Sequence, residues 1–101
     1  MQIHTTSGFV CEINEKKAKD WRFAKALADC DSGDNSRILK GATFAIPFLL
    51  EDNEQKLMDH ISEDGIADSE KMMDEFNEIV AQIGQETKKS DSQIKEKKII
   101  R

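Results

Sequence analysis

The sequence predicts an α+β fold that is mainly α, in which an N-terminal β-hairpin packs on about four helices and a flexible C-terminal tail follows. Three observations predict it. The stretch TTSGF near the N-terminus places a glycine turn between short apolar runs, which is typical of a hairpin. Most later segments carry apolar residues at helical spacing. The composition, 35% charged with one proline and 5 glycines, favours a helical protein over a β-rich one.

The length predicts a single domain. A chain of 101 residues can bury a modest core but no deep enclosed pocket. We expect one compact domain over residues 1–85, with the hairpin in 1–13 and the helices within 15–84. Residues 86–101 are polar and mixed in charge, so we expect a disordered or conditionally helical tail there.

The register of the hairpin follows from its turn. A three-residue loop, Thr6-Ser7-Gly8, puts glycine at the left-handed position of a G1 bulge, whereas a two-residue loop would need Ser7 at positive φ. Directly opposite residues then share one face, which we expect to pack on the helices. The pairs on this face are Thr5 with Phe9, Ile3 with Cys11, and Met1 with Ile13. The other face carries His4, Val10 and Glu12.

Two helices are expected between the hairpin and residue 50. Asn14 is the predicted N-cap of the first, whose inward positions are Ala18, Trp21, Ala24, Leu27 and Ala28. The DSGDN turn ends this helix and offers Asp34 or Asn35 as the cap of the second. Pro47 lacks a backbone donor and should kink or split the second helix. The apolar positions of the second helix are Ile38, Leu39, Ala42, Ala45, Ile46 and Leu49.

Two further helices are expected after residue 50. Asp52 is the predicted cap of the third helix, whose inward residues are Leu57, Met58 and Ile61. The last helix has the clearest pattern, with Asp68 or Ser69 as its cap and Gly84 as its end. Its apolar face holds Met72, Phe76, Ile79, Val80 and Ile83.

The charge is unevenly distributed. Residues 1–85 hold 9 Lys and Arg against 17 Asp and Glu, a net charge of −8, whereas residues 86–101 hold 6 against 3, a net charge of +3. An acidic body is a poor partner for phosphate backbones, so we expect no direct nucleic-acid binding. The sequence has no signal-peptide pattern and no run of about 18 apolar residues, so we expect a cytoplasmic protein that binds no membrane.

Patterns that carry chemistry are weak throughout. The stretch DCDSGDN resembles a calcium loop, but counting from Asp29 its sixth and twelfth positions hold Asp34 and Lys40 in place of Gly and Glu. The two cysteines are better explained as small core residues. Acidic pairs are expected to be solvated, and no catalytic motif is present. We therefore expect no cofactor, no metal and no enzymatic activity. Zinc prefers His and Cys ligands, but no pair of these residues has the spacing of metal ligands; they are His4, Cys11, Cys30 and His60.

Three stretches are candidates for contact with a partner. The free edge of the hairpin could add a strand, and the sparse isoleucines of the tail could fold onto a groove. Methionine is frequent on adaptable binding surfaces, although in a small domain it also simply fills the core. The candidate residues are His4 and Val10 on the hairpin, Met72, Met73 and Phe76 in the last helix, and Ile94, Ile99 and Ile100 in the tail.

Several stretches, taken in chain order, resemble one protein family. They are TTSGF followed by EI, DW early in the first helix, FLLEDNEQKLMDHI, MMDEFNEIV and a Lys-Lys-Ser after the last helix. Over roughly residues 1–90 they are similar to the small tail assembly chaperones of long-tailed phages and prophages of Gram-positive bacteria. The sequence departs from that pattern at Pro47 and at Glu51-Asp52-Asn53, where Gly-Glu-Glu is expected.

The resemblance implies a function and partners. Chaperones of this family are thought to coat the tape-measure protein, to recruit tail-tube subunits made of the major tail protein, and to leave before the virion matures. The resemblance therefore implies a phage tail assembly chaperone that acts during virion morphogenesis in the host cytoplasm. The short product of such genes is often extended by a ribosomal frameshift. Lys88-Lys89 matches the position where a slippery codon pair commonly falls.

Two other functions remain open at this point. An acidic regulatory binding protein, such as an inhibitor or an antitoxin-like protein, would occupy a basic groove of its target, and the net charge of residues 1–85 supports it. A small enzyme or metal protein is the weaker alternative. The sequence is also compatible with a homo-oligomer.

Overall fold

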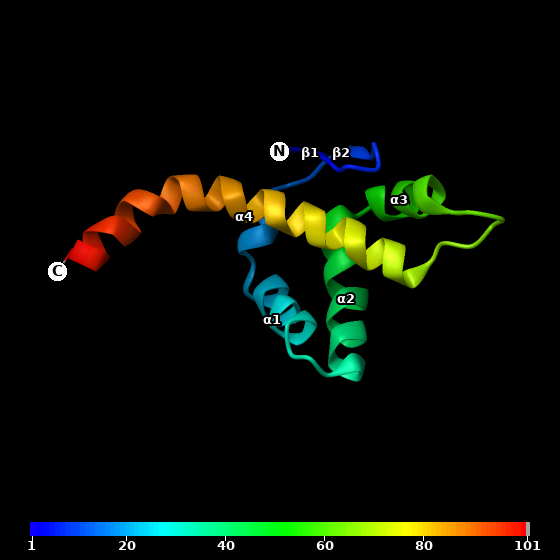
Figure 1. The fold of residues 1–101 in the computed structure, drawn as a ribbon, viewed down its shortest axis with the longest axis horizontal. Helices are drawn as coiled ribbons and strands as arrows, with labels where there is room; N and C mark the ends of the chain where they lie inside the picture. The colour runs from blue at the N-terminus through cyan, green and yellow to red at the C-terminus, as the bar shows by residue number, and fades with distance from the viewer. Residues whose placement is uncertain (101) are drawn as a thin grey trace.

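The computed structural model describes the backbone of residues 1–100 and the side chains of residues 1–84. It confirms an α+β fold that is mainly α, with an N-terminal hairpin and helices packed against it (Figure 1). The elements, in order, are β1 (Gln2–His4), β2 (Val10–Glu12), the 3-10 helix η1 (Lys17–Lys19), α1 (Trp21–Cys30), α2 (Asn35–Leu50), α3 (Asn53–Ile61) and α4 (Ser69–Ile100).

The hairpin has the predicted three-residue loop and register. Ile3 pairs with Cys11, and the Thr5 amide donates to the Phe9 carbonyl oxygen at 2.9 Å. Gly8 has a φ of +95°, the left-handed conformation that the bulge requires. The predicted inner face is buried, with Met1 half-buried at its end. The turn chemistry therefore determined which face of this ribbon packs on the helices.

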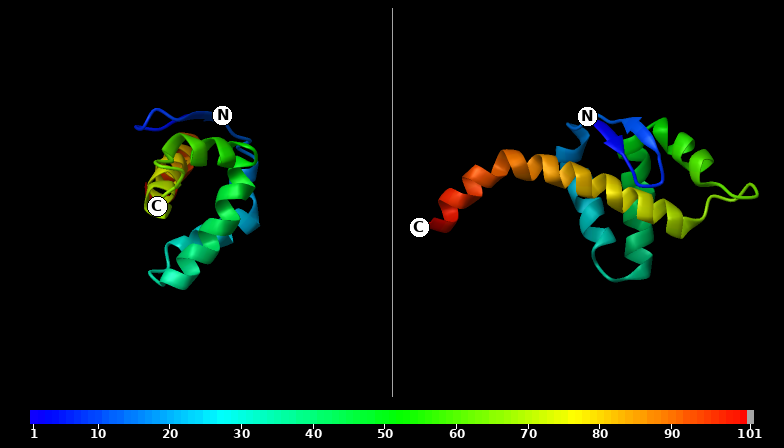
Figure 2. Two further views of the ribbon diagram at one scale, coloured as in Figure 1. Left: turned by 90° about the vertical axis from the view of Figure 1, so that its right-hand side faces the viewer. Right: turned by 45° about the horizontal axis from the view of Figure 1, so that its top comes forward.

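α4 lies between the hairpin and an arm formed by α1 and α2. The arm helices run side by side, and α4 crosses them with the hairpin on its other side (Figures 1 and 2). Phe76 of α4 contacts Phe23 of α1 edge-on, with ring centroids 6.4 Å apart. Glu75, the residue before Phe76 on α4, accepts a hydrogen bond from Thr5 of the hairpin. One hydrophobic core thus joins residues of both strands and all four α-helices.

The two arm helices touch at Gly41. A Cβ atom on this residue would lie 2.4 Å from the carbonyl oxygen of Ala26 and 2.9 Å from the Cβ of Asp29. Glycine is therefore the residue that permits this close approach of α2 to the backbone of α1. The approach positions Phe48 of α2 over Phe23 of α1, with ring centroids 6.3 Å apart.

The prediction for the first helix is wrong in its start and in part of its inward face: Ala18 and Leu27 pack against the core, but the other three predicted inward residues do not. The side chain of Asn14 accepts from the Lys16 amide, but the chain then forms only η1. α1 begins later, at Trp21, because the carboxylate of Asp20 accepts from the Arg22 amide at 2.7 Å and caps the helix there. The buried residues of α1 are Phe23 and Ala26, whereas Trp21 is 75% exposed and the predicted inward residues Ala24 and Ala28 are also exposed.

The second helix is not split at its proline. Asp34 caps α2 as predicted, and the helix runs through Pro47 to Leu50. Pro47 removes one amide donor, but it stands in the last turn, so only the helix end loses a hydrogen bond. The Glu51 amide donates to the Pro47 carbonyl oxygen at 3.0 Å, and Glu51 then leaves the helix with a φ of +54°.

The later caps follow the prediction in part. Asp52 stands at the N-cap of α3, but its side chain makes no capping hydrogen bond. Asp68 caps α4 through the Glu70 amide at 2.7 Å. Gly84 does not end α4, because the helical backbone continues to Ile100. The side chains of residues 85–101 lie outside the described part of the chain, so the prediction for the tail stays a prediction.

Candidate protein-binding site

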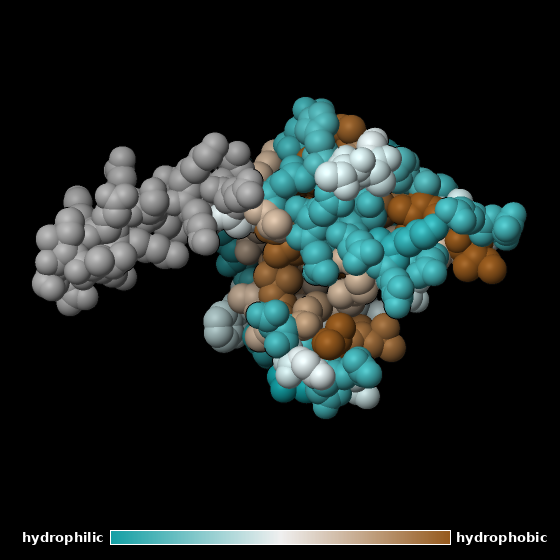
Figure 3. Space-filling view, in the orientation of Figure 1, coloured by the Kyte–Doolittle hydropathy of each residue, from teal (hydrophilic) through white to brown (hydrophobic). Residues whose placement is uncertain are grey.

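An apolar groove lies where α2, α3 and the start of α4 meet. We call it the methionine groove; it has a volume of about 180 Å³ and is lined by Leu39, Ala42, Thr43, Ile46, Glu54, Met58, Ala67, Ser69, Met72 and Met73. Its three methionines are half-buried, and Leu39 at its rim is 63% exposed. Figure 3 shows apolar residues on the arm and beside the loop between α3 and α4, among largely hydrophilic neighbours.

A tight turn before α4 positions the methionines. Asp64 and Gly65 both have positive φ, and Glu63 and Ile66 exchange two backbone hydrogen bonds across them, each 3.0 Å long. This is the geometry of the mirror-image turns that Asp-Gly favours. Lys71 donates to Glu63 at 2.7 Å, and this hydrogen bond lowers the pKa of the Glu63 carboxyl. The turn and the ion pair fix the first turn of α4, from which Met72 and Met73 face the groove.

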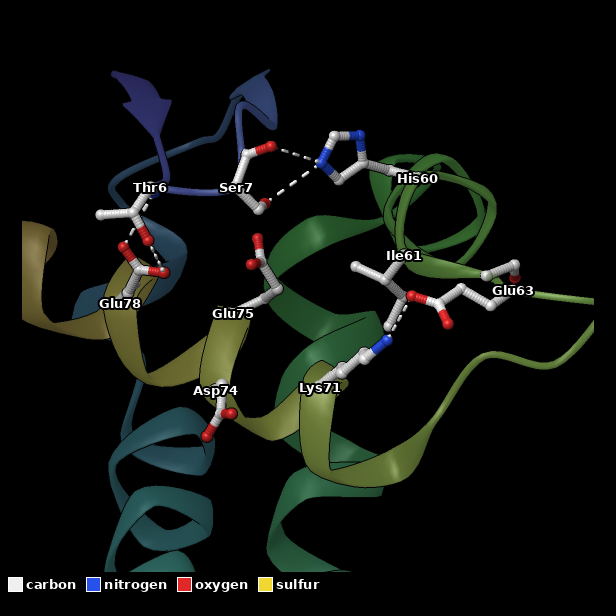
Figure 4. Close-up of a pocket in the computed structure, with 10 residues that line it drawn as sticks. Thr6, Ser7, His60, Ile61, Glu63, Lys71, Asp74, Glu75 and Glu78 are labelled. Carbon is white, nitrogen blue, oxygen red and sulfur yellow. Dashed lines mark hydrogen bonds and ion pairs between the residues drawn. The ribbon is translucent and has the colours of Figure 1, made fainter.

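A larger polar pocket lies under the hairpin loop (Figure 4). It has a volume of about 490 Å³ and is lined by Thr6, Ser7, His60, Ile61, Ser62, Glu63, Lys71, Asp74, Glu75 and Glu78. Thr6 donates from both its amide and its hydroxyl to Glu78. His60 Nε2 lies 3.1 Å from the Ser7 hydroxyl and 3.2 Å from the Ser7 carbonyl oxygen. These hydrogen bonds attach the hairpin loop to both α3 and α4.

The Ser7–His60 pair does not have the arrangement of a hydrolase. The Nε2 atom that faces the Ser7 hydroxyl also hydrogen-bonds the Ser7 carbonyl oxygen, so it carries a proton as a donor. Within the described residues, no carboxylate hydrogen-bonds the other ring nitrogen to orient the imidazole. Among those residues there is also no group of three or more His, Cys, Asp or Glu that could hold a metal ion. The pocket therefore supports a structural role for this pair.

The edges of the hairpin are partly closed by side chains. The amide group of Gln82 on α4 binds the backbone of His4 on both sides, accepting from its N–H and donating to its carbonyl oxygen. On the other strand, the Asn53 amide donates to the Glu12 carbonyl oxygen at 2.9 Å. The prediction that a partner strand pairs at His4 is therefore wrong, because Gln82 already occupies that edge. Val10 stays on the exposed face, with 48% of its surface accessible.

The other predicted contact residues separate into three groups. Met72 and Met73 are half-buried and line the methionine groove. Phe76 is only 1% exposed and belongs to the core, so its assignment to partner contact is wrong. Met58, a methionine that the sequence also offers as a surface candidate, lines the same groove, and the prediction missed Leu39 because it counted that residue only among the apolar positions of the second helix. The tail residues Ile94, Ile99 and Ile100 lie outside the described side chains.

Both cysteines are free thiols. Cys11 is buried in the hairpin face and Cys30 is half-buried at the end of α1, so both serve as the small packing residues that the sequence predicts. Burial raises the pKa of each thiol above its ordinary value. Both groups are therefore protonated and poorly nucleophilic at neutral pH.

Comparison with known proteins adds no relative: no family model, no curated protein and no solved structure matches this chain. Among the described residues, no helix has the length and apolar composition to cross a membrane.

Proposed function

We propose that this protein is a non-enzymatic tail assembly chaperone of a long-tailed phage or prophage, acting in the host cytoplasm. It binds the tape-measure protein during tail morphogenesis and recruits tail-tube subunits. The partners are those that the resemblance implies. The observation that carries the proposal is the methionine groove, an accessible apolar surface built from three helices.

The size of the groove suits side chains of a protein partner. Small-molecule sites usually enclose about 300–1,000 Å³, whereas this groove has about 180 Å³. A cavity of ~150 Å³ accepts a benzene ring, so there is room for about one aromatic or leucine side chain. Methionine side chains rearrange at low cost, which lets the groove accept different apolar residues along a repeating helix.

The chemistry of a tape-measure protein matches this surface. Such a protein is long and helical, with apolar stripes that stay exposed until the tube surrounds them, so it aggregates unless it is covered. Residues 41–85, which form most of the groove, hold 2 Lys and Arg against 11 Asp and Glu. An amphipathic helix with lysine or arginine beside its apolar stripe would match both the groove and its acidic surroundings.

Co-expression with fragments of the tape-measure protein from the same genome tests the proposal. We expect the wild-type chain to keep such a fragment soluble and to co-purify with it. Leu39→Glu, which places a charge at the exposed rim of the groove, should abolish both effects. Ala81→Glu is the matched control, because Ala81 is exposed on α4 and lies outside the groove. Equal capture by wild type and L39E, with both folded, would refute the proposed use of the groove.

Salt dependence separates the chaperone from the acidic regulatory binder. A chaperone that grips apolar side chains should retain its partner at about 0.5 M salt, where exposed charges are screened within a few ångströms. An inhibitor that occupies a basic groove should lose most of its affinity there. Loss of the tape-measure fragment at high salt would favour the inhibitor.

The encoding DNA offers an independent test. A slippery A-rich heptamer at the codons for Lys88-Lys89, with an overlapping open frame one base back, would support the chaperone. If the heptamer and the overlapping frame are absent, the DNA gives the chaperone no support. The co-expression experiment with Leu39→Glu then decides between the proposed functions.

A further inference from the structure

The polar pocket under the hairpin loop carries more negative than positive charge. The single ammonium group of Lys71 lines it together with four carboxylates, those of Glu63, Asp74, Glu75 and Glu78. Lys71 donates to Glu63 at 2.7 Å, so these two charges offset each other. The other three carboxylates form no ion pair within the described residues. A ligand that enters the pocket therefore meets carboxylates that no cation of the described chain neutralises.

Glu75 is buried and yet has no counter-ion. Only 6% of the residue is exposed, and its one hydrogen bond in the described chain runs from the neutral Thr5 hydroxyl to Oε1, at 2.7 Å. The second oxygen, Oε2, accepts no hydrogen bond from a described residue. Oε2 is open to the pocket, because no fully enclosed side-chain oxygen of the described residues lacks a partner. Burial of a carboxylate without a cation is unfavourable, so this atom points to a positively charged ligand.

The unpaired carboxylates lie at different depths. Glu75 is buried, Glu78 is half-buried and Asp74 is exposed. Figure 4 shows Glu75 pointing from α4 toward the hairpin loop, with Glu78 on one side of it and Lys71 on the other. The two hydrogen bonds that Glu78 accepts from the hairpin loop orient its carboxylate but bring no positive charge. Negative charge thus extends from the rim of the pocket to its base.

The size and spacing of the pocket favour one kind of cation. Its volume of about 490 Å³ lies in the range of about 300–1,000 Å³ that is usual for sites of organic ligands. Within the described residues, no three His, Cys, Asp or Glu side chains come together as metal ligands. A guanidinium group is planar, always charged and has five N–H donors in a fork, so it can bind two separate carboxylates at once. The compact ammonium group of lysine matches such a site less well.

We propose that the polar pocket binds an arginine side chain of a partner protein, whose guanidinium group pairs with Oε2 of Glu75 and with the carboxylate of Asp74 at the rim. The hydrogen bond from Thr5 holds the Glu75 carboxylate in position before the partner arrives. Arginine is among the residues that contribute most to the affinity of protein interfaces, above all in pockets that exclude water. The proposal does not depend on the methionine groove or on tail assembly, because the pocket can be tested with arginine alone.

A titration of the isotope-labelled full chain with the peptide acetyl-Gly-Arg-Gly-amide tests the pocket. We expect saturable changes in the NMR amide resonances of Thr6, Ser7 and Glu75, with a Kd of roughly 1 mM, since a single side chain supplies the contact. The same peptide with citrulline in place of arginine has nearly the same shape but no charge, and it should cause no saturable change. The lysine peptide should bind about fivefold more weakly than the arginine peptide.

Two variants of α4 separate the pocket from the general charge of the helix. Glu75→Gln can still accept the hydrogen bond from Thr5 but carries no charge, so it should weaken binding of the arginine peptide about tenfold or more. Glu70→Gln is the matched control, because Glu70 is exposed on the same helix and lies outside the pocket. It should bind the peptide like the wild type. Should Glu75→Gln fail to fold, Asp74→Asn at the exposed rim replaces it and should weaken binding about threefold or more.

Four outcomes would overturn the proposal. They are the absence of any saturable change, equal binding of the arginine and citrulline peptides, wild-type affinity in the folded pocket variant, and equal losses in that variant and in Glu70→Gln. Tighter binding of calcium ions or of putrescine at the same resonances would also overturn it, because the pocket would then be a site for a free cation.

Discussion

At the scale of single residues, the buried carboxylate of Glu75 links α4 to the hairpin. Glu75 is 6% exposed and accepts from the Thr5 hydroxyl at 2.7 Å. The Thr5 hydroxyl also lies 3.1 Å from that of Ser7, whose own hydroxyl contacts His60. One short network therefore links α4, the hairpin loop and α3, and sequence pattern alone did not reveal it, because Thr5 and Glu75 are 70 positions apart.

Removing the Thr5 hydroxyl should be costly. Thr5→Val keeps the shape of the side chain but leaves the buried Glu75 carboxylate without its donor, so we expect a loss of about 1–3 kcal/mol in the free energy of unfolding. Urea denaturation measures it. Thr6→Val is the matched control: its partner Glu78 is closer to solvent, and water can replace the bond, so we expect a change below about 0.5 kcal/mol. Equal effects in the two variants would contradict this account.

The cap of α1 should respond to acid. Hydrogen bonds from the Arg22 side chain and amide lower the pKa of Asp20 from its ordinary value of 3.8 to about 2. Because the folded-state pKa is depressed, the stabilisation is present above pH 3.8 and is lost as the pH falls to about 2. The difference in Tm between wild type and Asp20→Asn should therefore shrink over that interval. A constant difference would show that the charge of Asp20 contributes nothing.

At the scale of elements, the crossing of α1 and α2 depends on Gly41. In Gly41→Ala the added Cβ would meet the Ala26 backbone at 2.4 Å, and overpacking of this kind typically costs about 1–3 kcal/mol. This exceeds the roughly 1 kcal/mol by which alanine is the better helix former, so we expect net destabilisation in urea. Gly84→Ala is the control, because nothing lies within 4 Å of a Cβ there and the substitution should be neutral or stabilising.

The elements also show what the sequence could predict. The hairpin register followed from one glycine, and the inward faces of α3 and α4 followed from their apolar spacing. The inward face of α1 followed only in part: Leu27 packs on the core as predicted, but the helix begins at the Asp20 cap and buries Phe23 in place of Trp21. The methionine groove could not be predicted from the sequence. It forms because the Asp64-Gly65 turn brings the start of α4 beside α2, and local sequence pattern does not encode that long-range arrangement.

At the scale of the whole molecule, the hairpin is an integral part of the core. Ile3, Phe9 and Ile13 are each at most 6% exposed. Burial of a large apolar side chain stabilises by about 1.5–3 kcal/mol, so these three residues contribute an amount comparable to the ~5–15 kcal/mol stability of a typical domain.

Deletion of residues 1–13 should therefore abolish cooperative unfolding. The truncated chain would expose the apolar surfaces that the hairpin covers on α3 and α4. Thermal unfolding followed by circular dichroism measures this, with Gln2→Ala as a control, because Gln2 is exposed on the outer face. A sharp transition near the wild-type Tm in the truncated chain would contradict the integral role of the hairpin.

The side-chain amide of Gln82 on α4 hydrogen-bonds the backbone of β1, and this limits strand pairing between two copies of the chain at that edge. A bare strand edge is a template for irreversible β-aggregation, but here one side chain occupies the backbone groups of His4 that would seed it. At β1, growth by backbone pairing would first have to break bonds that hold the fold together. A second molecule that approaches this part of β1 therefore meets side chains of the protein and not free backbone groups.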